Sequence, residues 1–322
     1  MRAAARSIGL VAHDTAVELA RLRRGLVAFC YQMLGSPFDA EDAAQDVLER
    51  AWRARDSFDP ERASFPTWCF RIARNVCIDR LRTAPRRPLP RDLQAPGLEV
   101  GAPLVAAVDV PWLMPAPTSW CTTSAVESSA ERAQDVRLAV TAMLQKLPPR
   151  QRGVLVLRDV LGFTAAETGA VLGMSVASVN SALQRARDAV RDGAPRRQPL
   201  APGAVERYAR AIEQADADEL ASLVAEDVVF EMPPVPNWTR GREPYRAFMK
   251  HLFSWRGTEW QTRTVSANGQ HGILLYRGTP QAWEPHTLQL LDGDGFGAIG
   301  HVLVYQDASL FELFEGEFSP RR

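Results

Sequence analysis

The chain has 322 residues, which suits two or three domains because single cores rarely grow past a couple of hundred residues. A hydrophobic fraction of 46% and a charged fraction of 24% indicate a folded, soluble protein. The net charge of zero is unevenly divided, because residues 1–198 hold 27 basic and 21 acidic side chains whereas residues 199–322 hold 11 and 17. The basic residues 1–198 suit a polyanionic partner such as nucleic acid, whereas the acidic residues 199–322 do not.

The N-terminus offers one short apolar run, Ile8–Ala12, which is too short for a signal peptide or a membrane span. We therefore expect a cytoplasmic protein with no membrane partner. The four cysteines form no Cys-x-x-Cys pair and lie apart from the five histidines, so we predict no metal site and no cofactor.

The first helical block is predicted from about Ala16 to Leu81 by apolar residues at three- and four-residue spacing. Within it, a helix near 38–52 turns small apolar residues inward and leaves an acidic stripe on its other side. A lone acidic stripe usually serves solubility, and it is poorly placed for DNA, but it suits a basic protein partner. The stripe consists of Asp42, Gln45, Asp46 and Glu49.

A second motif runs from Phe65 to Arg82. Its helical spacing gathers guanidinium and amide groups on one face, which is suited to holding phosphates and bonding to bases, with aromatic rings near its start. A solvated charged face over core aromatics is the open alternative. The candidate DNA-contacting residues are Trp68, Arg71, Arg74, Asn75, Asp79 and Arg82.

The Pro-rich stretch that follows forbids a continuous helix, so residues 85–130 are predicted to be an extended linker. Trp112 and Leu113 are apolar residues within it that need a surface to bury against.

The second helical block, about 131–193, holds the strongest motif of the chain. Thr164 to Glu167 is a capping box, Gly173 suits a tight turn, and Ser175 can cap the next helix. This layout predicts a helix-turn-helix, with an ordinary helical hairpin as the alternative. The outward residues that can reach base edges and phosphates are Ser178, Asn180, Ser181, Gln184, Arg185 and Arg187.

A basic hinge, residues 194–202, leads into a part of different character. Helices are predicted at 204–214, 217–225 and 243–253. Strands are predicted at 228–232, 259–266, 271–277, 286–291 and 297–305, separated by Gly or Asp-Gly turns. Residues 203–322 are therefore predicted to form an α+β domain.

The order of these motifs resembles the extracytoplasmic-function sigma factors of bacterial RNA polymerase, of the sigma-70 superfamily, over residues 16–192. The resemblance implies two all-α domains: region 2 (16–84), whose acidic helix binds core polymerase and whose Arg/Asn helix captures a base of the −10 element, and region 4 (131–193), whose recognition helix reads the −35 element of promoter DNA. Asn180 and Ala182 stand where Lys and Arg are frequent in the family, so the −35 preference is expected to differ.

Residues 110–115, Val-Pro-Trp-Leu-Met-Pro, resemble a linker segment of those sigma factors that carry a fused SnoaL-like domain. Residues 203–322 fit that fusion, which implies a cone: a curved antiparallel sheet wrapped on helices around an apolar pocket. In such proteins the extension is thought to replace a separate anti-sigma protein. Whether an unknown small ligand fills the pocket is left open.

Two other classes of function stay open. One is a DNA-binding regulator whose cone senses a ligand without recruiting polymerase, although it leaves two of the three motifs unexplained. The other is an enzyme with an accessory DNA-binding domain, in which carboxylates and imidazoles of the cone would serve as acid and base. We expect no catalysis, because Glu231 alternates with apolar residues on a predicted strand and His271 follows a turn. The four residues considered are Asp227, Glu231, His271 and His301.

Overall fold

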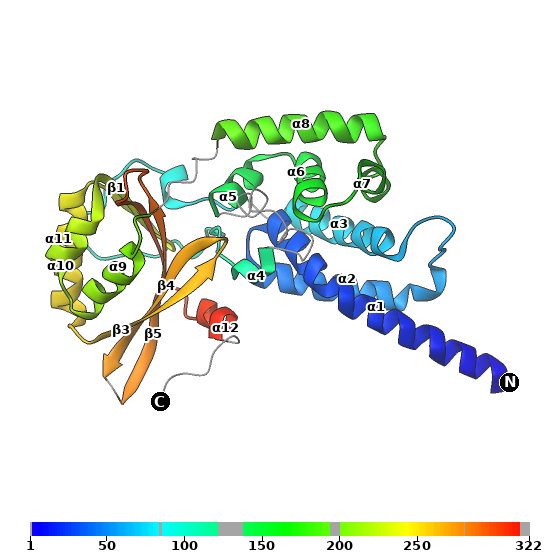
Figure 1. The fold of residues 1–322 in the computed structure, drawn as a ribbon, viewed down its shortest axis with the longest axis horizontal. Coiled ribbons are helices and arrows are strands. Elements are labelled where there is room, and N and C mark those ends of the chain that lie inside the picture. The colour runs from blue at the N-terminus through cyan, green and yellow to red at the C-terminus, as the bar shows by residue number, and fades with distance from the viewer. Residues whose placement is uncertain (1, 84–85, 122–137, 194–199, 280, 316–322) are drawn as a thin grey trace. The chain divides into compact units, whose positions relative to one another are not determined.

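The computed structural model describes residues 2–83, 86–121, 138–193, 200–279 and 281–315 (Figure 1). The chain forms two compact units, one of residues 1–86 with 119–194 and the other of residues 87–118 with 195–322. The end of the predicted linker, the predicted start of the second helical block and most of the hinge lie outside the described residues. In the described part, no helix is long and apolar enough to cross a membrane.

The first unit is helical. Its first stretch holds α1 (Arg2–Leu34), α2 (Pro37–Arg53), the short turn η1 (Arg55–Ser57) and α3 (Phe65–Thr83). Its second stretch holds the end of α4 (Thr118–Cys121), α5 (Leu138–Lys146), α6 (Pro149–Leu155), the π-helical segment η4 (Val156–Val160), α7 (Ala165–Leu172) and α8 (Val176–Gly193).

Local chemistry explains where α2 begins and how it is held. The hydroxyl of Ser36 accepts a hydrogen bond from the Asp39 amide at 3.2 Å, and Pro37 occupies the first helical turn, where a missing N–H costs nothing. Arg80 of α3 then bonds to the carboxylate of Asp46 at 2.7 Å and to the Asp39 carbonyl at 3.1 Å. These bonds join α2 and α3 beside their shared apolar contact.

The second unit is α+β, as predicted. It begins with the turn η2 (Pro90–Asp92) and continues with α9 (Ala204–Glu213), α10 (Ala217–Leu223), β1 (Val224–Met232), β2 (Val235–Arg240), α11 (Arg242–Arg256), β3 (Trp260–Ala267), β4 (Gln270–Thr279), β5 (Ala282–Gly293), β6 (Ile299–Tyr305) and α12 (Ser309–Glu315). Two elements were not predicted from the sequence. They are β2, whose Pro and Gly neighbours resemble a loop, and α12.

One six-stranded sheet has the order β2-β1-β6-β5-β4-β3. Four of its pairs are antiparallel, but β1 and β6 run parallel. The predicted curved antiparallel sheet is thus corrected to a mixed one. The reason is topological: β6 inserts beside the first strand after the chain has passed through the β3-β4-β5 meander, and it arrives in the same direction as β1.

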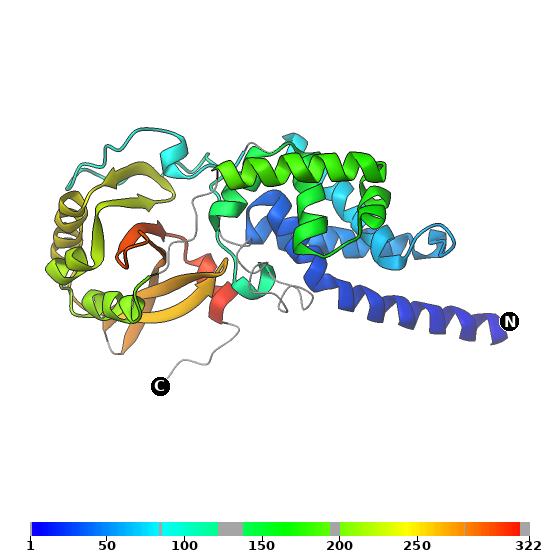
Figure 2. The same ribbon diagram turned by 45° about the horizontal axis from the view of Figure 1, so that its top comes forward.

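The sheet is buried on both faces. Helices α9, α10 and α11 gather on one side of it (Figures 1 and 2), where Phe230, Ile273 and Val302 join the same apolar cluster as Tyr208 and Tyr245. Since side chains alternate along a strand, the neighbours of these residues point to the other face. That face is buried too, and its residues include Glu231, Leu274, Leu288, Leu290, Leu303 and Tyr305.

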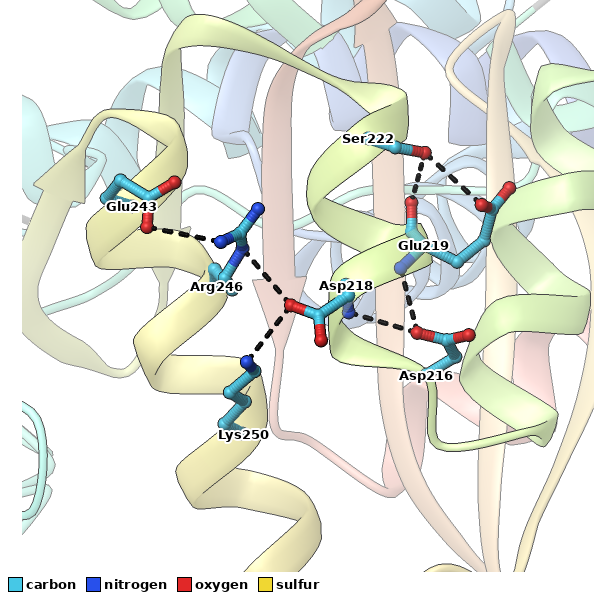
Figure 3. A network of polar contacts seen from close by, with 7 residues as sticks. All are labelled: Asp216, Asp218, Glu219, Ser222, Glu243, Arg246 and Lys250. Atoms are coloured by element: carbon cyan, nitrogen blue, oxygen red, sulfur yellow. Dashed lines mark hydrogen bonds and ion pairs between the residues drawn. The ribbon is translucent and has the colours of Figure 1, made fainter.

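Surface ion pairs join α10 to α11 (Figure 3). Asp218 contacts Arg246 at 3.3 Å and Lys250 at 3.0 Å, while Asp216 caps α10 through the amides of Asp218 and Glu219. Exposed pairs of this kind contribute about 0–1 kcal/mol each, so they orient the helices more than they stabilise the domain.

Candidate functional site

The predicted acidic stripe lies on α2, with Ala44, Val47 and Ala51 buried on the opposite side. Its members differ in what they contact. Asp46 accepts a hydrogen bond from Arg80 at 2.7 Å, and Glu49 accepts one from Arg53 at 2.9 Å. Asp42 and Gln45 are exposed and have no hydrogen bond from another described side chain. The free part of the stripe is therefore Asp42 and Gln45, close to the start of α2.

The predicted −10 residues lie on α3, but they do not form one free face. Trp68 packs at 5.5 Å from the ring of Phe58 and at 5.6 Å from that of Phe65, which makes it part of a small aromatic cluster. Arg82 forms an ion pair with Asp79 at 3.3 Å. Asn75 is exposed, so it is the member of this group that stands most open to a ligand.

Arg71 and Arg74 face the second stretch of the same unit. The Nη2 of Arg71 donates a hydrogen bond to the carbonyl of Ala170 on α7 at 3.2 Å. Burial lowers the pKa of Arg74, and the nearby charges of Arg150 and Arg71 lower it further. In this structure the Arg-bearing face of α3 thus lies against the first helix of the helix-turn-helix.

A buried arginine adds to that contact. Arg152 of α6 donates hydrogen bonds to the carbonyl of Met33 on α1 and to the side chain and carbonyl of Gln145. Burial lowers its pKa to about 10. The rings of Phe70 and Phe163 pack edge to face at 4.9 Å between the same two stretches. The two predicted DNA-reading parts therefore pack into one body, which the sequence analysis, treating them as separate domains, did not foresee.

The helix-turn-helix forms as its local chemistry requires. The hydroxyl of Thr164 accepts from the Glu167 amide at 3.2 Å, and the Glu167 carboxylate accepts from the Thr164 amide at 2.8 Å. These hydrogen bonds from Thr164 lower the pKa of Glu167. Gly173 ends α7 with φ 66°, a left-handed conformation that favours glycine, and Ser175 accepts from the Ser178 amide at 3.2 Å to begin α8.

All six residues predicted to read DNA from α8 are exposed. Arg187, however, is held by a bidentate ion pair with Asp159 at 2.6 and 2.8 Å, and Gln184 bonds to Asp188 at 3.1 Å. Arg185, Asn180 and Ser181 have no side-chain bond to any described residue. These three are the side chains of α8 that are freest to reach a partner.

The linker residues Trp112 and Leu113 are buried within the second unit, at 7% and 0% exposure. The indole of Trp112 donates to the carbonyl of Ala107 at 3.0 Å, and the Leu113 amide donates to the carbonyl of Pro88 at 3.2 Å. The linker thus closes into a loop that belongs to the same compact unit as the cone.

The four residues weighed as an enzyme's acid and base are not assembled inside the cone. Glu231 and His301 do contact each other at 2.8 Å, but on the sheet face turned away from α9, α10 and α11. Asp227 and His271 are exposed. The helix side instead holds Tyr208, whose hydroxyl bonds to Tyr245 and to Gln289, each at 2.8 Å. Burial raises the pKa of both tyrosines.

Arg91 was missed by the sequence analysis. Its amide donates to the Glu231 carboxylate at 2.8 Å, and its Nε lies 3.5 Å from the same group. An arginine in a Pro-rich segment gives no periodic signal, because 140 residues separate it from its partner. The sequence gives one indication that Glu231 has a partner: this acidic residue lies between Phe230 and Met232 on a strand.

Comparison with known proteins shows three matched families: Sigma-70 region 2 over residues 19–87, Sigma-70 region 4 over 137–190 and the SnoaL-like domain over 205–298. The ECF RNA polymerase sigma factor SigG of Mycobacterium tuberculosis is 36% identical over 301 residues, which cover 91% of this chain and 81% of SigG. SigJ of the same organism is 30% identical over 226 residues, or 66% of this chain and 63% of SigJ. The crystal structure of SigJ aligns with a TM-score of 0.58 over 93% of this chain and 99% of that one, at 22% identity, and so shares its fold.

Proposed function

This chain belongs to the extracytoplasmic-function sigma factors of RNA polymerase. We propose that three of its helices carry out separate steps of transcription initiation. Asp42 and Gln45, with the rest of the α2 stripe, bind a basic surface of core polymerase. Residues of α3 capture a base of the −10 element, and the free side chains of α8 read the −35 element. The observation that carries this division is the exposure of polar side chains on three separate helices: Asp42 and Gln45 on α2, Asn75 on α3 and Arg185 on α8.

Base capture by α3 suits a group of guanidinium and amide donors, since the Watson–Crick edge of a base can be read only after the base leaves the paired stack. Arg71 must leave the carbonyl of Ala170 before it can take part. The proposal therefore requires α3 and α7 to separate when the protein engages its promoter.

This requirement leads to the first prediction. We expect promoter-specific initiation with purified core polymerase, and only weak binding of duplex DNA by the free protein, because its two reading faces are packed into one body. Transcription from a cognate promoter in vitro, and fluorescence anisotropy of the labelled duplex at physiological salt, measure the two properties. Tight sequence-specific duplex binding by the protein alone would contradict the proposal and favour a regulator that acts without polymerase.

The cone is proposed to regulate the sigma regions in cis. Support comes from the linker, which is packed with the cone in one unit although it connects the two sigma regions along the chain. That a small ligand fills the cone stays a prediction.

Removal of residues 199–322 tests this regulation. We expect transcription with core polymerase to differ several-fold from that of the full chain, because the linker loses the surface on which it lies. Trp112→Ala in the full chain should reproduce part of the change, since Trp112 is buried in the loop. Circular dichroism checks that the helical unit stays folded, and equal activity of all three proteins would refute regulation by the cone.

A further inference from the structure

Hydrogen bonds between neutral groups join the linker to the cone at three places. The amides of Gly97 and Leu98 donate to the carbonyl of Trp238 on β2 at 2.9 and 3.1 Å. The amide of Ala107 donates to the carbonyl of Pro234 at 2.9 Å, and Ala116 exchanges two hydrogen bonds with Asn268. Through Gly97 and Leu98 the linker thereby bonds to the outer side of β2, an edge strand that pairs with β1 on its other side.

A fourth contact between the linker and the cone involves a buried charge. The side chain of Glu231 has 0% exposure. Its carboxylate contacts Nε2 of His301 at 2.8 Å and the amide of Arg91 at 2.8 Å, with Nε of Arg91 at 3.5 Å. Burial alone would raise the pKa of Glu231, but the hydrogen bond and the electrostatic interaction with His301, together with the positive charge of Arg91, lower it below its ordinary value.

We propose that this cluster is a latch, in which Glu231, itself bonded to His301, holds Arg91 and so keeps the linker in its looped state. The proposal rests on the proposed function, in which the cone regulates the sigma regions. A carboxylate that is buried without its partners is strongly disfavoured. The linker can therefore be released only when the contact between Glu231 and Arg91 breaks and water solvates the Glu231 carboxylate instead.

The local structure around Arg91 holds it in position. Turn η2 aims the Arg91 amide at Glu231, and the Asp92 carboxylate accepts a hydrogen bond from the Leu89 amide at 3.0 Å. The two residues that shortly precede this turn meet the far end of the loop, since Arg87 donates to the carbonyl of Trp112 at 3.0 Å and the Leu113 amide donates to the carbonyl of Pro88. Trp112 and Leu113 thus act on the latch through the turn that carries Arg91.

A looped linker restricts how far the sigma regions can separate. Elements at −35 and −10 lie about 25 base pairs apart, or roughly 85 Å at about 3.4 Å per base pair. The hydrogen bond between Leu113 and Pro88 closes a loop of about 25 residues, and these residues no longer add to the distance that the linker can span. That distance is thereby shortened by roughly 85 Å, at about 3.4 Å per residue. The remaining chain between α3 and α5, about 30 residues, must then be almost fully extended. When the latch is open, the whole linker can span this distance without being fully extended. Opening the latch therefore favours binding to the promoter.

The test uses the full-length variants Arg91→Gln and Glu231→Gln, with Arg207→Gln and Glu206→Gln as matched controls on the exposed side of α9. Hydrogen–deuterium exchange followed by mass spectrometry reports the amides of residues 94–113. We expect exchange at least tenfold faster in both latch variants and unchanged in both controls. Transcription with core polymerase should rise several-fold in the latch variants alone.

The two readouts separate the latch from the function on which it rests. Unchanged exchange in Arg91→Gln overturns the latch, whatever transcription does. Faster exchange with unchanged transcription supports the latch and overturns regulation of transcription through the linker. Arg91 is partly exposed, so Arg91→Gln keeps the test valid if the buried Glu231→Gln fails to fold.

Discussion

Asp42→Lys is expected to lower the affinity of the protein for core polymerase more than tenfold, and to do so equally for every promoter. Asp42 lies on the exposed side of α2, and no described side chain bonds to it. If the stripe docks on a basic surface, the substitution places two like charges together, which costs several kcal/mol at an interface. Each 1.4 kcal/mol lowers affinity tenfold.

The choice of Asp42 over its neighbour matters. Asp46 accepts a hydrogen bond from Arg80 at 2.7 Å, so a basic residue there would also disturb the contact between α2 and α3. Titration of the fluorescently labelled protein with core polymerase measures the affinity, and Glu206→Lys on the cone is a control with the same change in charge. Unaltered affinity, or a loss seen at one promoter only, would show that α2 is not the polymerase contact.

Arg185→Ala should weaken use of a promoter by about 1–3 kcal/mol, the usual value of a good contact between arginine and a base in the major groove. The guanidinium of Arg185 is exposed, and Ser178 and Ser181 share its stripe of α8. The loss should vanish when the −35 sequence is scrambled, because a base contact is specific to its base pair. Affinity for core polymerase should not change.

Arg191→Ala is the matched control, since Arg191 is exposed near the end of the same helix, where it bonds to Asp188 at 2.8 Å. Transcription in vitro from the native and the scrambled promoter measures the two effects. A loss of equal size on both promoters would mean that Arg185 contacts phosphate or polymerase and does not read the sequence.

Arg187 shows why exposure alone does not identify a DNA-reading residue. Its side chain is exposed, yet Asp159 holds it through two hydrogen bonds at 2.6 and 2.8 Å. Asp159 lies 28 residues away in the sequence, so helical spacing cannot reveal the pair. Among the side chains of α8, the free ones, Asn180, Ser181 and Arg185, are the better targets for altered promoter specificity.

Local patterns were enough to predict the family, the fold class and most elements. The capping box of Thr164 and Glu167, the left-handed Gly173 and the inward stripe of α8 depend on neighbours three or four residues apart, and these interactions are set within a single turn of helix. The same holds for the acidic stripe of α2. The family and the fold class are confirmed by the comparisons.

Only the tertiary structure decided which residues meet across the chain. Arg71 bonds to Ala170 over 99 residues, and Arg91 to Glu231 over 140, so neither contact leaves a periodic trace in the sequence. The parallel pairing of β1 and β6 depends likewise on where the last strand inserts. The linker was predicted to be extended because proline forbids a helix there, but proline does not dictate where an extended chain lies. The linker lies where its amides meet acceptors of the cone: the Arg91 amide bonds to the buried carboxylate of Glu231, and the Gly97 and Leu98 amides bond to the outer edge of β2.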